Sequence, residues 1–267
     1  MKYPVLITLL YITLTGLPAL SSASNDGTAL AVKLYNRPDG IDAASHATMV
    51  LSGKGNKPRQ RTLYTYRTDR ENGETWSLTR FTKPADINGT GLLTLDLPHD
   101  DSNQWIYLPA LDRARRISSS RKGGRFVGSD IVYEDLSKRD VEKDQHRLRG
   151  DGKVGKITTT ILESTPIDPD NSTYSKRVNW VHMNTLIPLQ TDYYTSGNEN
   201  PVKRLKVKKI KKIQGFWTVL DSTVYDLETG HQTRIVTQAI KYDQQLPDTL
   251  FSRQSLSDTR IEENYRP

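Results

Sequence analysis

Short runs of alternating apolar and polar side chains, separated by turn residues, most constrain the fold of this 267-residue chain. Tyr64 and Tyr66 share one face of a run, and Trp76 and Leu78 share one face of the next, with a turn at residues 73–74 between them. A period of two with turns between the runs is typical of antiparallel strands. We count about ten or eleven such strands. The pattern therefore predicts a mainly β fold.

One early segment has a helical pattern instead. Residues 26–28 can cap a helix, Leu30 and Leu34 are four residues apart on one face, and Arg37-Pro38 ends the pattern. We therefore predict a short helix over residues 26–36. Because no linker, internal repeat or low-complexity block divides the remaining chain, we also predict a single domain.

A long connection also interrupts the strand pattern. Residues 123–149 are glycine-rich at the start and highly charged afterwards, and residues 129–136 are compatible with a short helix. Connections of this length without strand character are often functional. We expect this segment to cross one face of the sheet.

The N-terminus has the pattern of a secretory signal peptide. A lysine is followed by an apolar stretch over residues 5–14, a glycine and proline break, and small residues up to Ala23. The apolar run is shorter than the roughly 20 residues that a membrane-spanning helix needs. We predict that residues 1–23 are cleaved after Ala23, and that residues 24–267 form a domain exported to the periplasm.

The sequence contains no pattern typical of a catalytic or metal site. There is no cysteine, which excludes disulfides, thiolate catalysis and thiolate zinc sites. The five histidines lie in separate turns or strands and lack the spacing that presents two metal ligands from one face. Neither a nucleophile elbow nor a phosphate-binding loop is present. We therefore predict that the protein is not an enzyme and uses no metal or cofactor.

Basic residues gather in two places. In residues 203–213, Leu205 and Val207 share a face and lysines fill most other positions, as in a solvated strand that resists edge pairing. Attraction to anionic lipid head groups is the functional alternative. Nucleic acid is not an expected partner, because no aromatic side chain for base stacking lies in the run. The second cluster, either a solvated loop or a clamp for phosphate or carboxylate groups, comprises Arg113, Arg115, Arg116, Arg121, Lys122 and Arg125.

Six motifs carry a resemblance to a known family. They are FTKPADINGT at residues 81–90, QWIYLPALDRARRI at 104–117, GGRFVGSDIVYEDL at 123–136, GFW at 215–217, TGH at 229–231 and LPDTLF at 246–251. In this order and spacing they resemble the LolA-like outer membrane lipoprotein-sorting protein family. The resemblance covers nearly all of the chain after the predicted signal peptide.

The resemblance implies an incomplete, half-open antiparallel β-barrel whose apolar concave face is covered by short helices or loops. In better-known relatives this cavity holds the acyl chains of a lipoprotein in transit. The implied function is a periplasmic carrier of a lipid or a lipid-modified protein, directed toward the outer membrane. The alternative is an accessory or scaffold subunit of a resistance-nodulation-division-type inner-membrane permease, without cargo of its own. A carrier predicts a large apolar cavity, whereas a scaffold predicts a filled core.

Apolar residues that share strand faces are the candidate ligand contacts, although ordinary core packing explains each of them equally well. The candidates for the cavity wall are Leu93, Leu95, Trp105, Tyr107, Val178, Trp180, Trp217 and Val219. The candidates for a movable cover over the cavity are Phe126, Ile131, Val132 and Leu136.

Overall fold

The computed structural model describes residues 21–55 and 57–267, which form one antiparallel sheet of thirteen strands and two α-helices. The strands are β1 (Asp42–Ser52), β2 (Arg59–Asp69), β3 (Thr75–Lys83), β4 (Gly91–Asp96), β5 (Asn103–Leu108), β6 (Arg113–Ile117), β7 (Asp144–Val154), β8 (Ile157–Pro166), β9 (Lys176–His182), β10 (Ile187–Tyr194), β11 (Lys203–Ile213), β12 (Phe216–Asp226) and β13 (Gln232–Tyr242). The helices are α1 (Ser21–Tyr35) and α2 (Arg260–Glu263). Residues 1–20 of the predicted signal peptide lie outside the described residues.

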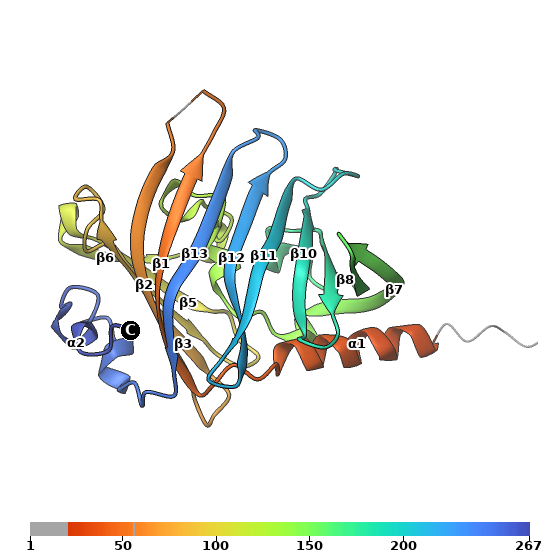
Figure 1. Cartoon of the computed structure of the whole chain (residues 1–267), viewed down its shortest axis with the longest axis horizontal. Helices are drawn as coiled ribbons and strands as arrows, with labels where there is room; N and C mark the ends of the chain where they lie inside the picture. Colours follow the sequence, from red (N-terminus) through yellow and green to blue (C-terminus); the bar gives the residue numbers. More distant parts are fainter. Residues whose placement is uncertain (1–20, 56) are drawn as a thin grey trace, which may run out of the picture.

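The sheet curls without closing on itself. Its strand order is β6-β5-β4-β3-β2-β1-β13-β12-β11-β10-β9-β8-β7, so that β6 and β7 are the two free edges. Figure 1 shows the two ends of the sheet bending back from the central strands, with α1 along one end and α2 outside the other. The predicted half-open antiparallel barrel is therefore confirmed.

The number of strands differs from the expected ten or eleven. The strand β6 contains three arginines in five residues, and four of its five residues are exposed. The strand β7 begins at Asp144, within residues 123–149, which were expected to be a connection. Both are charged edge strands without an apolar face, so their sequences lack the alternation that identifies buried strands.

The helix α1 also begins earlier than predicted, at Ser21, and ends at Tyr35. Gly27 therefore lies inside the helix rather than in its cap. A Cβ atom at this position would approach the His146 carbonyl oxygen of β7 to 2.6 Å. Glycine thus permits the helix backbone to lie directly against the sheet. Leu30 of this helix packs against Leu162 and Val181 on the inner face of the sheet.

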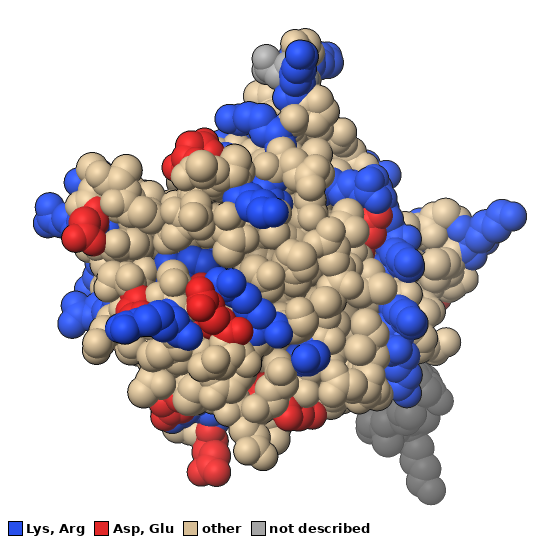
Figure 2. Space-filling model, turned by 60° about the vertical axis from the view of Figure 1, so that its left-hand side comes forward, with Lys and Arg blue, Asp and Glu red and all other residues tan. Residues whose placement is uncertain are grey.

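Apolar clusters cover both faces of the sheet between β1 and β5. Leu92 and Ile106 belong to the cluster on the concave face, whereas their neighbours Leu93 and Trp105 belong to the cluster on the outer face. The outer cluster is closed by the C-terminal segment, residues 246–265, which includes α2. Basic and acidic side chains are interspersed over this side of the molecule (Figure 2).

Candidate binding face and its cover

The concave face has an apolar floor that is filled by one connecting segment. We call residues 125–136 the cover; it includes short 3₁₀ turns at Phe126–Gly128 and Tyr133–Leu136. Phe126 is 1% exposed, and its ring centroid lies 5.4 Å from that of Phe81. The floor residues of the same apolar cluster are Ala47, Met49, Leu51, Leu63, Phe81, Leu92, Ile106 and Val224.

The tip of the cover is fixed to β13 through one buried carboxylate. Asp130 accepts hydrogen bonds from the Thr233 hydroxyl at 2.7 Å and from Nδ1 of His231 at 2.6 Å. Its backbone N–H donates to the Thr233 hydroxyl oxygen at 2.9 Å. Arg125 pairs with the same carboxylate and with Asp226. The cover is therefore held to the sheet at β13 by polar contacts as well as by Phe126.

The second anchor of the cover is Glu134, which binds to β9 and to the residues before it. Ser172 and the backbone N–H of Thr173 each donate to its carboxylate at 2.6 Å, and Arg177 forms an ion pair with it. Burial acts to raise the pKa of Glu134. The hydrogen bonds and the Arg177 charge outweigh it and hold the pKa below its usual value.

The third anchor joins Asp135 to Lys203, the first residue of β11. The Lys203 ammonium contacts the Asp135 carboxylate and the Tyr174 hydroxyl, and it lies 4.3 Å from the centroid of the Tyr193 ring. Tyr174 also donates to Asp135 at 2.9 Å. Burial lowers the pKa of Lys203, although the Asp135 charge acts in the opposite direction. The first lysine of the basic run is therefore internal and not solvated.

The cavities near the cover are lined by charged as well as apolar groups. A cleft of about 400 Å³ lies between the end of α1 and strands β2 and β3, and Arg67, Asp96 and Lys138 line it. The Lys138 ammonium lies 4.3 Å from the centroid of the Tyr35 ring. An adjoining cleft of about 660 Å³ also includes Tyr35 and Lys138, together with Phe216 and Asp243. Among the described residues, the cover thus occupies the apolar floor, and the open clefts are lined by both apolar and charged side chains.

Comparison with solved structures places this architecture in a family. A DUF1329 family protein from Desulfovibrio piger is 34% identical over 88% of this chain and 100% of that chain, with a TM-score of 0.84. A family model described only as an uncharacterized protein matches residues 73–258. The chain belongs to the DUF1329 family. None of the curated proteins matches it.

Two further structures extend the likeness of this DUF1329 family member. A domain named as an outer membrane lipoprotein-sorting protein, from Vibrio parahaemolyticus, is 28% identical over 88% of this chain and 99% of that chain, with a TM-score of 0.83. A LolA superfamily protein from Nitrosomonas europaea is 16% identical over 88% of this chain and 100% of that chain, with a TM-score of 0.67. The second likeness concerns the fold alone. Together they confirm the resemblance to the LolA-like lipoprotein-sorting proteins that the motifs predict.

The structure separates the predicted wall residues of this DUF1329 chain from the predicted cover. Phe126, Ile131 and Leu136 meet on the concave face. The residues that pack instead on the outer face, against the C-terminal segment, are Leu93, Leu95, Trp105 and Tyr107.

The remaining candidates lie elsewhere on the sheet and cover. Val132 forms an isolated backbone bridge with Arg125 at the base of the cover. Val178 is buried, while Trp180 is half-buried opposite Ile161 of β8. Val219 is half-buried, and Trp217 is 36% exposed. Val132 thus belongs to the cover, whereas the other four are not members of the apolar cluster that contains Phe126.

The floor beneath the cover was missed because the sequence analysis selected the aromatic side of each strand. Leu92 and Ile106 alternate with Leu93 and Trp105, so the same period of two contained the signal. Met49 and Leu51 likewise share a face of β1. In the part of the chain that the structure describes, no group of three or more His, Asp or Glu side chains is placed to hold a metal ion. Within the same residues, no helix has the length and apolar character needed to cross a membrane.

The buried carboxyl of Asp96 in the smaller cleft predicts a pH dependence of stability. Burial raises its pKa from 3.8 to about 6, against hydrogen bonds from Ser102 and the Lys138 backbone. A raised carboxyl pKa stabilises the fold below about pH 4, and this contribution is lost as the pH rises through 6. We expect Asp96→Asn to gain about 3 kcal/mol relative to the unsubstituted protein between pH 4 and pH 7. Urea unfolding of both proteins across this range measures the difference, and a constant difference would contradict the assignment.

Proposed function

We propose that this chain is a periplasmic carrier that binds a lipid or a lipid-modified protein on its concave face and carries it toward the outer membrane. The mature carrier comprises residues 24–267 as a single domain after removal of the signal peptide. It works by binding and release, without a covalent step, metal or cofactor. Its cargo occupies the apolar floor that the cover now fills.

The observation that carries this proposal is the apolar floor beneath a segment that belongs to no sheet. Phe126 and Ile131 occupy the floor, while the rest of the cover is joined to the sheet by polar side-chain contacts to β9, β11 and β13. An acyl chain can replace these apolar contacts at about 0.8 kcal/mol for each buried CH₂ group. As the cover moves, its polar side chains can be solvated, and their contacts with the sheet can form again when it returns. The likeness to the Vibrio parahaemolyticus lipoprotein-sorting domain supports the same function.

A reversible tether between the cover and β13 tests the proposal. The chain contains no cysteine, so Asp130→Cys with Thr233→Cys introduces a unique pair where the two side chains already touch at 2.7 Å. The oxidised and reduced forms are incubated with phosphatidylethanolamine and phosphatidylglycerol vesicles, separated from them, extracted and analysed by mass spectrometry. We expect the oxidised form to take up lipid at least about tenfold more slowly, because cover opening then requires the whole fold to open. Reduction should restore uptake.

The single variant Asp130→Cys is the matched control, since it loses the same carboxylate but cannot form the tether. Its uptake should not depend on the redox state. Equal uptake by the oxidised and reduced double variant would show that the cargo does not enter beneath the cover.

One observation favours the accessory-subunit alternative: in the described residues, side chains of the cover fill the apolar floor, and Arg67, Asp96 and Lys138 line the open cleft beside it. An accessory subunit would bind no lipid in either redox form and would co-purify with an inner-membrane permease of the resistance-nodulation-division type. Lipid in stoichiometric amounts in the reduced form excludes that alternative.

A further inference from the structure

The hairpin of β11 and β12 extends beyond the residues that pair with the neighbouring strands β10 and β13. β11 pairs with β10 only over residues 203–206, and β12 pairs with β13 only over residues 221–225. The two strands nevertheless pair with each other as far as Ile213 and Phe216 at the turn. Residues 208–219 therefore form a two-stranded ribbon at the lower rim of the sheet in Figure 1. We call these residues the ribbon.

The tip of the ribbon is held in place by β13 and by Arg37, which follows α1. The Gln214 side chain donates to the Tyr242 carbonyl oxygen at 3.2 Å and accepts from the Tyr242 N–H at 2.9 Å. The Phe216 ring packs on the Tyr242 ring at 4.9 Å. Arg37 donates to the Trp217 carbonyl oxygen at 2.8 Å. The backbone of the tip is therefore fixed, while the Trp217 side chain stays 36% exposed.

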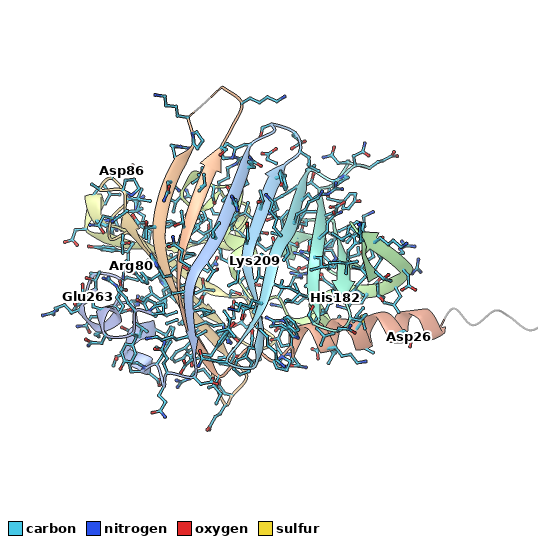
Figure 3. The ribbon with its side chains drawn as sticks, in the orientation of Figure 1. Asp26, Arg80, Asp86, His182, Lys209 and Glu263 are labelled. Carbon is cyan, nitrogen blue, oxygen red and sulfur yellow. The ribbon has the colours of Figure 1, made fainter. Side chains whose placement is uncertain are left out.

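The charge of the ribbon is of one sign. Its four lysines are all exposed: Lys208, Lys209, Lys211 and Lys212. No acidic residue occurs from Lys203 to Leu220, and the next one, Asp221, is paired with Arg234. Lys203 and Arg204, at the other end of β11, are paired with Asp135 and Asp192. The free positive charge of β11 is thus concentrated in the half of the strand nearest to Trp217, and Figure 3 labels Lys209 there.

Four exposed lysines beside an exposed tryptophan are complementary to an anionic lipid surface. Each lysine near an anionic lipid surface raises the partition coefficient of the protein about fivefold. The tryptophan ring, apolar with one polar N–H, favours the depth of the head groups. The same lysines oppose pairing of the free strand edge with another protein strand. A single exposed aromatic ring is also not the row of rings on which single-stranded nucleic acid stacks.

We propose that the ribbon docks this protein on an anionic phospholipid surface, with Trp217 at the level of the head groups. The larger cleft, of about 660 Å³, lies beside the ribbon and includes Phe216 in its wall. Docking therefore brings this cleft and the end of α1 toward the membrane. A use of this orientation in cargo transfer rests on the proposed carrier function, whereas the docking itself does not.

Co-sedimentation with vesicles of phosphatidylglycerol and phosphatidylethanolamine tests the docking. We expect the variant with Lys211→Gln and Lys212→Gln to lose about 25-fold in partition coefficient, and we expect binding to weaken as salt screens the charges. The unsubstituted protein should not bind vesicles of phosphatidylcholine alone. A blue shift of the tryptophan emission should accompany binding and should be absent in Trp217→Phe.

The matched control removes the same charge from another exposed hairpin, with Lys153→Gln and Lys156→Gln at the β7–β8 turn. The control should bind vesicles like the unsubstituted protein. Equal losses in both variants, salt-insensitive binding, or binding of a DNA oligonucleotide without binding of vesicles would each overturn the proposal. These results do not depend on the tethered cover, so docking and cargo binding fail or succeed separately.

Discussion

Replacing Arg80 with methionine should lower the free energy of unfolding by about 3–5 kcal/mol. Arg80 of β3, which Figure 3 labels, is 1% exposed and donates to the Glu262 carboxylate at 3.2 Å. It also donates to the carbonyl oxygens of Ser255 at 2.7 Å and Leu256 at 2.8 Å. Its guanidinium lies over Gly91, where a Cβ atom would approach Nη1 to 2.6 Å. Methionine leaves the buried Glu262 carboxylate with only the more distant Arg266 guanidinium, at 3.7 Å, as a cation, and it leaves these carbonyl groups without the Arg80 donors.

Urea unfolding measures this loss in the free energy of unfolding, and two further variants show which contacts cause it. Arg70→Met removes an exposed ion pair with Asp248 of the same C-terminal segment and should cost no more than about 1 kcal/mol. The double variant Arg80→Met with Glu262→Met should recover part of the loss, since no charge then stays buried. A loss below about 1 kcal/mol for Arg80→Met would show that water replaces the guanidinium and that the segment is not anchored there.

The two faces of the sheet show what the sequence could and could not predict. Alternation identified the strands and the coverage of both faces, because consecutive side chains must point to opposite sides. It could not identify which face is concave, since Leu92 and Leu93 are equivalent in sequence. The curvature that distinguishes them arises from the whole sheet. The C-terminal segment, residues 246–265, closes the outer cluster, and it has no periodic pattern from which a packed face could be predicted.

The anchors of the cover were beyond sequence analysis for a related reason. Residues 123–149 were predicted to cross one face of the sheet. The structure places the cover across the concave face, whereas residues 144–149 belong to β7. The partners of the cover, Arg177 and Lys203, are 43 and 68 positions away from Glu134 and Asp135. Only the strand order brings these residues together. Lys203 in particular looked like part of a solvated run, because its burial depends on Tyr174 and Tyr193 from other elements.

Replacing Lys203 with methionine should release the cover selectively. The substitution leaves Asp135, whose side chain is 14% exposed, with the Tyr174 hydroxyl and the Val132 N–H but without its cation. Breaking a buried pair on one side costs about 3–5 kcal/mol, which corresponds to at least about 100-fold faster opening of the segment that carries the charge. Hydrogen exchange at the N–H groups of Phe126 and Tyr133, which bond within the cover and to Gly124, measures that opening.

The neighbouring substitution Arg204→Met is the matched control for this experiment. Arg204 also pairs with a buried carboxylate, that of Asp192, but it does so between β10 and β11 and does not touch the cover. Its loss should leave exchange in the cover unchanged relative to the rest of the sheet. A uniform increase across the sheet in Lys203→Met would contradict the selective role of Lys203. Because the cover occupies the apolar floor, faster lipid uptake by Lys203→Met and not by Arg204→Met follows only for a carrier whose cargo enters beneath the cover.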